Sequence, residues 1–167
     1  MQKMTEENLT AAFAGESQAH MKYLAFAAQA MRDQRPNVAK LFEAIAYAER
    51  VHATNHLREL GGIGTTEANL GGAIGGETFE VEQMYPAYDA VAKAQGEAKA
   101  ERSIHYAFEA EKIHAGMYGD ALAKVKEGAD IEAVDVYICP VCGHTVFAGA
   151  PDRCPVCNAR GSSFRKF

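Results

Sequence analysis

Four long runs of the chain place apolar residues, many of them alanine, along one stripe of an α-helix, with polar residues elsewhere. They predict helices at residues 5–33, 37–60, 77–95 and 97–126, the first capped by Thr5. Helix-ending signals follow the four runs at Pro36, Gly61, Gly96 and Gly128. We therefore expect a mainly α protein.

Residues 61–76 contain seven glycines and are expected to form a long, non-helical connection. Short turns join the first predicted helix to the second and the third to the fourth, so each pair should form a hairpin. A long crossover between two helical hairpins is typical of ferritin-like four-helix bundles. We predict such a bundle for residues 1–130. Pro86 lies inside the third helix and is expected to kink it.

Two Glu-x-x-His motifs lie in the second and fourth predicted helices, and single glutamates lie in the other two. The three-residue spacing puts carboxylate and imidazole on one helix face. Glu49 interrupts an otherwise apolar stripe, where a buried carboxylate is costly unless it is paired or bound to metal. Such a pattern indicates a carboxylate-bridged two-metal site inside the bundle. The candidate ligands are Glu16, Glu49, His52, Glu77, Glu80, Glu111 and His114.

The donor types favour iron or manganese at this site. Carboxylate and imidazole ligands suit both metals, and a bridging glutamate on each of two helices suits a metal pair. The five glutamates carry a charge of −5, which two ferrous ions would bring close to neutrality. Part of the formal net charge of −5 for the whole chain would then be compensated by bound metal.

All four cysteines fall within residues 136–167, which are expected to form a separate small domain. Two C-x-x-C pairs, Cys139 with Cys142 and Cys154 with Cys157, are separated by 11 residues. Four thiolates at this spacing can hold one tetrahedral metal, and both iron and zinc are chemically allowed. About 30 residues cannot bury a sufficient apolar core, so the metal should supply the domain's stability.

Charge and hydropathy limit the partners. The chain is acidic without a basic run, so we expect no nucleic-acid partner. No run of 18 apolar residues predicts a membrane span, and the first seven residues have no apolar core like that of a signal peptide. We therefore expect a cytoplasmic protein.

Over essentially its whole length the chain resembles the rubrerythrin family. The matching features are Glu16 with Tyr23, Glu49-x-x-His52, Glu77-x-x-Glu80 followed by Met84-Tyr85-Pro86, Glu111-x-x-His114, and the two cysteine pairs. The resemblance implies a ferritin-like di-iron domain fused to a rubredoxin-like domain that holds one iron. It also implies a homodimer that reduces hydrogen peroxide in defence against oxidative stress. The electron donor would be a protein such as rubredoxin or an NAD(P)H-dependent reductase.

The resemblance also implies a role for each ligand. Glu49 and Glu111 would bridge the irons, and His114 and Glu77 would complete one of them. Glu16 would bind the second iron, whose coordination would be completed by Glu80 or His52. The catalytic residues would then be Glu80, His52 and Tyr23, with the Tyr23 ring either a simple core aromatic or a hydrogen-bond donor to a ligand carboxylate.

Two other functions are compatible with the same residues. The chain could oxidise and store ferrous iron with oxygen as oxidant, or it could be a binding module whose four cysteines hold structural zinc. One departure from the family pattern bears on the second of these. Asn158 follows the second cysteine pair where rubredoxins usually have glycine, although asparagine tolerates the left-handed backbone better than most residues. Among the remaining histidines, His20 and His56 are expected to pack near the metal face without binding metal.

Overall fold

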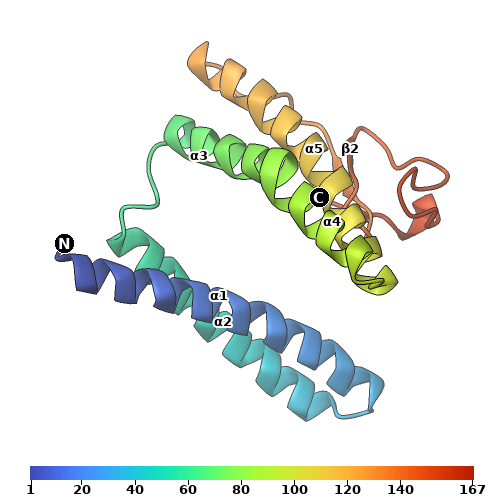
Figure 1. The fold of residues 1–167 in the computed structure, drawn as a ribbon, viewed down its shortest axis with the longest axis horizontal. Helices are drawn as coiled ribbons and strands as arrows, with labels where there is room; N and C mark the ends of the chain where they lie inside the picture. Colours follow the sequence, from blue (N-terminus) through green and yellow to red (C-terminus); the bar gives the residue numbers. More distant parts are fainter. The chain divides into compact units, whose positions relative to one another are not determined.

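The computed structural model describes residues 1–167 and divides into two compact units, Met1–Gly64 and Thr65–Phe167. Each unit contains one of the predicted helical hairpins (Figure 1). No helix has the length and apolarity that crossing a membrane requires.

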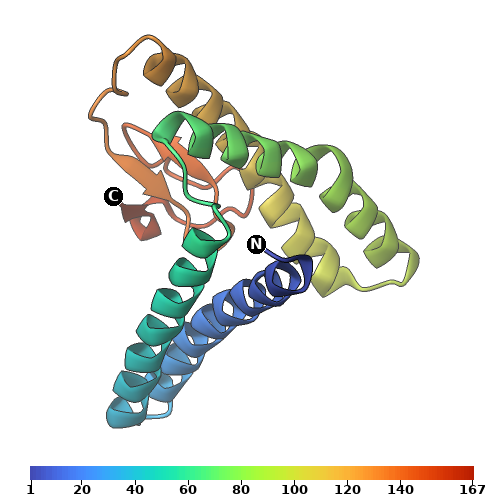
Figure 2. The same cartoon turned by 90° about the vertical axis from the view of Figure 1, so that its left-hand side faces the viewer.

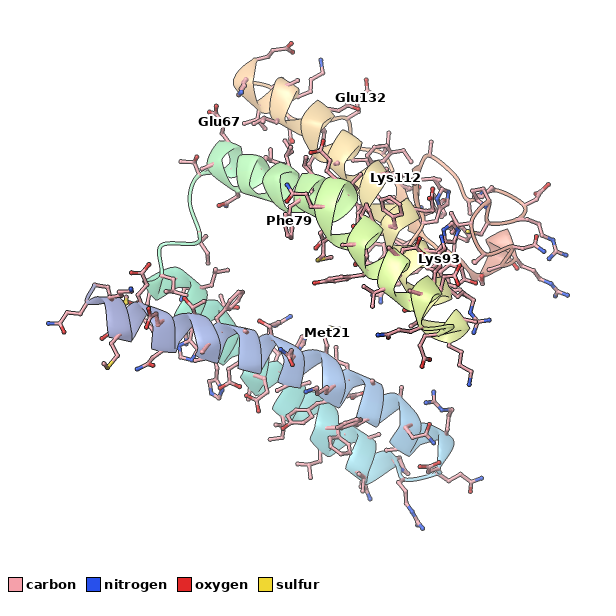
Figure 3. All side chains as sticks on the ribbon, in the orientation of Figure 1. Met21, Glu67, Phe79, Lys93, Lys112 and Glu132 are labelled. Carbon is pink, nitrogen blue, oxygen red and sulfur yellow. The ribbon has the colours of Figure 1, made fainter.

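The first unit is a hairpin of α1 (Lys3–Arg32) and α2 (Pro36–Glu59), which lie side by side (Figures 1 and 2). Its buried residues are all alanines: Ala27, Ala30, Ala39, Ala46 and Ala53. Small side chains let the two helix backbones approach closely, and Phe42 packs against one end of this seam. Larger apolar side chains stay at the surface of the unit, for example Met21, which is 62% exposed (Figure 3).

The start of α1 differs slightly from the prediction. The helix begins at Lys3, and its N-cap Gln2 makes no side-chain hydrogen bond, so Thr5 is not the cap. Glu6 still lies in the first turn, where its charge is favourable near the positive end of the helix. The predicted second and fourth helices are confirmed, as α2 and as α5 (Ala98–Lys126).

The predicted non-helical connection at residues 61–76 is wrong for most of its length. Helix α3 spans Thr66–Phe79, and its N-cap Thr65 accepts a hydrogen bond from the Ala68 amide at 3.2 Å. Glu67 lies in the first turn, close to the positive end of the helix (Figure 3). Glycine disfavours helix by roughly 1 kcal/mol per residue, but α3 packs along α5, and packing commonly outweighs propensity. Only a short connection therefore remains between α2 and α3.

The predicted kink at Pro86 takes the form of a π-helix. Residues Glu80–Met84 form one wide turn between α3 and α4 (Tyr85–Ala94), closed by a bond from the Tyr85 amide to the Glu80 carbonyl. In a regular α-helix the Pro86 ring would clash with the carbonyl of Glu82. The wider turn relieves that clash, and Figure 2 shows the helix changing direction here.

The cysteine-containing segment forms a small antiparallel sheet in the order β2-β1-β3. The strands are β1 (Val136–Ile138), β2 (Thr145–Phe147) and β3 (Arg165–Lys166), with Tyr137 opposite Val146 and Lys166. A 3₁₀ turn, Gly161–Ser163, precedes β3. Strand β2 lies against α5 within the second unit, so the small sheet is seated on that helix.

Candidate metal centres

The first cluster of donors lies on the hairpin of α1 and α2. Glu16 comes from α1, and Glu49 and His52 lie one turn apart on α2. The His52 Nδ1 atom is 3.1 Å from Glu49 Oε2 and 3.9 Å from Glu16 Oε1. The potential ligand atoms all lie within 4.8 Å of one another, so one cation could contact all three side chains.

The second cluster repeats this composition in the other unit. Glu77 comes from α3, and Glu111 and His114 lie one turn apart on α5. The His114 Nδ1 atom is 2.6 Å from Glu111 Oε2, and again all three donors lie within 4.8 Å of one another. Glu80, one turn beyond Glu77, is the first residue of the π-helix and lies outside this group of three.

Burial and neighbouring carboxylates raise the pKa of glutamates in both clusters. Burial, proton sharing with Glu111 and the charge of Glu111 together raise the pKa of Glu77 to about 7. Burial and the charge of Glu111 raise the pKa of Glu80 as well. In the first cluster, proton sharing with Glu49 raises the pKa of Glu16. Each cluster therefore favours an added positive charge, either a proton or a metal ion.

The donor chemistry fits iron at both clusters. Two carboxylates and one imidazole per cluster are hard or borderline ligands of the kind that suit ferrous and ferric ions. The structure thus gathers six of the seven predicted ligands into two clusters of matching composition, one in each unit.

The four cysteines converge on a single point in the small domain. Cys139 Sγ lies 3.5 Å from Cys157 Sγ, and Cys142 Sγ lies 3.5 Å from Cys154 Sγ. Four thiolates at about 2.3 Å from a tetrahedral metal would be about 3.8 Å apart, so small adjustments would admit the ion. Three of the cysteines are buried, with Tyr106 of α5 and Phe164 packed against them.

The backbone of both cysteine turns is built to face a metal. Gly143 and Asn158, each directly after a cysteine pair, adopt left-handed φ values of 79° and 61°. Asparagine at position 158 thus keeps the turn geometry expected of glycine. Burial opposes ionisation of the Cys154 thiol, but the amides of Cys157 and Val156 outweigh it and lower the pKa of Cys154 to about 7.

Other predicted residues lie apart from the donor clusters. The Tyr23 ring packs on the rings of Phe26 and Phe42, with centroid distances of 6.2 and 6.0 Å. The His20 Nδ1 atom is 2.7 Å from the Ala46 carbonyl oxygen, so His20 can join α1 to α2 in the packing role expected of it. His144 is 8% exposed and stands edge-on to Phe164, and burial lowers the pKa of its imidazole.

One residue at the second cluster escaped the sequence analysis. Thr145 of β2 places its Oγ1 atom 2.9 Å from His114 Nε2, and it is 4% exposed. The two residues are 31 positions apart, and no local motif connects them. Only the seating of the small sheet on α5 brings them together.

Comparisons with known proteins match both parts of the chain. Residues 7–122 fit the family model described as rubrerythrin, and residues 137–165 fit the one described as rubrerythrin, rubredoxin-like domain. Rubrerythrin-2 of Clostridium acetobutylicum is 44% identical, covering 98% of this chain and 97% of that protein. Nigerythrin of Nitratidesulfovibrio vulgaris is 37% identical, covering 92% of this chain and 81% of that protein.

Solved structures give the same relationship. Nigerythrin in its fully reduced, all-ferrous state superposes with a TM-score of 0.58 at 30% identity, covering 98% of this chain and 86% of that one. A mixed-valence state of nigerythrin gives a TM-score of 0.57 at 31% identity, with the same coverage.

Proposed function

Because this chain belongs to the rubrerythrin family, with a di-iron site and a four-cysteine iron site, we propose that it reduces hydrogen peroxide to water. The observation that carries the proposal is the pair of matched donor clusters, each with two carboxylates and one imidazole. Six donors of this kind are enough to hold two irons, and the chain has an additional carboxylate in Glu80.

The ligand roles follow the family pattern. Glu49 and Glu111 would hold both irons, while Glu77 and His114 would complete the ligands of one of them. Glu16 binds the other iron, together with Glu80 or His52. Both Glu-x-x-His pairs already hold carboxylate and imidazole within 3.1 Å of each other, which supports this assignment.

The reaction consumes two electrons and two protons for each peroxide and yields two water molecules. The two irons, when bound, each supply one electron. The chain's own carboxylates and imidazoles bind the irons, and in the metal-free protein they also bind protons. With a pKa of about 7 in the metal-free protein, Glu77 can carry a proton at neutral pH until a metal ion takes its place. The ring of Tyr23 packs in the aromatic group of the first unit, and we assign to its hydroxyl a hydrogen bond to a ligand carboxylate when iron is bound.

The remaining assignments concern partners. The four cysteines would hold an iron that supplies electron transfer to the di-iron site, and the electron donor would be rubredoxin or an NAD(P)H-dependent reductase. The protein acts as a homodimer in the cytoplasm. These assignments rest on family membership and on the rubredoxin-like domain at residues 137–165.

Rapid mixing of the reduced protein with peroxide or with oxygen tests the proposal. The iron-loaded chain is reduced without oxygen, and oxidation of the di-iron site is followed by absorbance after mixing with each oxidant. A peroxidase should react much faster with peroxide than with oxygen. Faster reaction with oxygen, followed by retention of added ferric iron, would favour iron storage instead. A colourless purified protein with one zinc per chain would favour structural zinc at the four cysteines.

A further inference from the structure

The small domain contacts the second donor cluster through one buried hydroxyl. Thr145 lies at the start of β2, and its Oγ1 atom is 2.9 Å from His114 Nε2 on α5. It is also 2.9 Å from the Gly143 carbonyl oxygen, one residue beyond Cys142. A single side chain therefore contacts both a proposed iron ligand and the backbone turn of a cysteine pair.

The directions of these hydrogen bonds follow from counting hydrogens. A threonine hydroxyl has one hydrogen and two lone pairs, and a carbonyl oxygen can only accept. The Thr145 hydrogen is therefore donated to Gly143, which leaves a lone pair facing His114. The contact is favourable only when His114 Nε2 carries a hydrogen and donates it.

The opposite ring nitrogen faces the carboxylates. His114 Nδ1 is 2.6 Å from Glu111 Oε2, so a cation placed there could bind both atoms. Neutral imidazole has one N–H and one lone pair, so Nδ1 can bind metal only if the hydrogen is on Nε2. Thr145 can accept a hydrogen bond only from the tautomer with the hydrogen on Nε2. Metal binding at Nδ1 requires that same tautomer.

The surroundings are poorly suited to a water molecule that would replace the Thr145 hydroxyl as hydrogen-bond partner of His114. The cavity beside His114 and Thr145 has a volume of about 370 Å³, and apolar side chains form most of its wall. They include Leu70, Met117, Val136, Ile138 and Phe147. An ordered water needs two to four polar partners, and besides His114 and Thr145 the only polar side chain in this wall is Tyr118.

We propose that Thr145 is a positioning residue for the di-iron site: its hydroxyl fixes His114 in the Nε2–H tautomer, so that a folded four-cysteine domain prepares a ligand of the other metal centre. The inference rests on the proposed ligand role of His114. Interactions that orient metal-binding histidines typically change metal affinity 10–100-fold.

The test compares Thr145→Val, which keeps the shape and removes the hydroxyl, with Thr145→Ser, which keeps the hydroxyl. Full-length protein with iron in the four-cysteine site is titrated with Mn²⁺, a hard ion that avoids thiolates, and free Mn²⁺ is measured by electron paramagnetic resonance. We expect Thr145→Val to weaken Mn²⁺ binding about 10–100-fold and Thr145→Ser to bind within about threefold of the parent. Equal affinity of Thr145→Val and the parent, or equal weakening of both variants, would overturn the proposal.

Two further measurements separate this inference from the ligand assignment. His114→Ala should lose the corresponding Mn²⁺ binding, and if it does not, the ligand role of His114 fails as well. In protein loaded with zinc at both centres, ¹⁵N spectra of the histidine rings should show a slowly exchanging His114 Nε2–H. That signal should persist in Thr145→Ser and exchange faster in Thr145→Val.

Discussion

Glu77 links metal binding to the pH dependence of stability. Its pKa is raised from 4.5 to about 7 by burial and by Glu111, so between these values the folded metal-free protein binds more protons than the unfolded chain. The free energy of unfolding of the metal-free protein should therefore fall as pH rises from about 4.5 to 7. Bound metal should remove this dependence.

Replacing Glu77 with glutamine should stabilise the metal-free protein at pH 8 by roughly 1 kcal/mol, a value reduced for solvent screening at a partly exposed site. Thermal unfolding of parent and variant at pH 5 and pH 8 measures the effect, and the gain should disappear at pH 5. Glu82→Gln, on the exposed side of the same helical run, is the matched control and should change little. A gain of equal size at both pH values would contradict the assigned origin.

The proposed bridging glutamates give a second prediction at this scale. Glu49→Ala or Glu111→Ala removes a carboxylate that two irons would share, so iron content should fall from two to one or none at the di-iron site. The variants should lose metal affinity but not folding stability, because the change relieves repulsion among the carboxylates of the metal-free protein. Iron analysis together with thermal unfolding checks both parts. A normal iron content in either variant would rule out the bridging role.

Glu80 and His52 should alternate as ligands of one iron. An anionic carboxylate favours the ferric ion, whereas a neutral imidazole suits the ferrous ion. We expect Glu80 to be bound in the oxidised protein and His52 in the reduced protein. Crystal structures of one preparation in both oxidation states provide the measurement, and unchanged ligands in the two states would exclude the exchange.

Local patterns were enough to predict which donor side chains cluster, but not every element that holds them. The Glu-x-x-His and Cys-x-x-Cys spacings act within one helical turn or one tight turn, so each motif carries its own geometry. Helix α3 was missed because its glycines oppose helix locally, while the packing along α5 that stabilises it comes from distant sequence. Thr145 was missed for the same reason. Pro86 correctly marked a disturbance, but proline alone does not distinguish a kink from a π-turn.

The glycines of α3 offer a test at the scale of a whole element. A Cβ added at Gly72 or Gly76 meets no atom within 4 Å, so alanine at either position should raise helix stability by about 0.5–1 kcal/mol. Gly96→Ala is the contrasting control, since its φ of 70° penalises any side chain. Chemical denaturation of the three variants measures the effect. Destabilisation by alanine at position 72 or 76 would mean that this helix face is covered in the assembled protein.

At the scale of the whole molecule, the two metal centres should be separable in function. Replacing Cys139 and Cys154 with serine removes half of the thiolates and should unfold the small domain, because a domain of this size depends on its metal. The helical part should keep its iron, with affinity weakened as far as Thr145→Val weakens it. One round of peroxide reduction by pre-reduced protein should survive, while turnover with an electron donor should collapse. Unchanged turnover would show that electrons enter elsewhere.

The π-turn at Glu80–Met84 gives this helix a tolerance that the others lack. Each residue of an α-helix advances the chain by about 100° around the axis, so an insertion or deletion normally rotates every later side chain away from its neighbours. A π-turn takes up one additional residue without that rotation. Glu77 on one side, and Tyr85 against Phe108 on the other, thus keep their orientation towards α5. Among related chains, we expect insertions or deletions of one residue in this helix to fall at Glu80–Met84, where they leave the metal ligands facing α5.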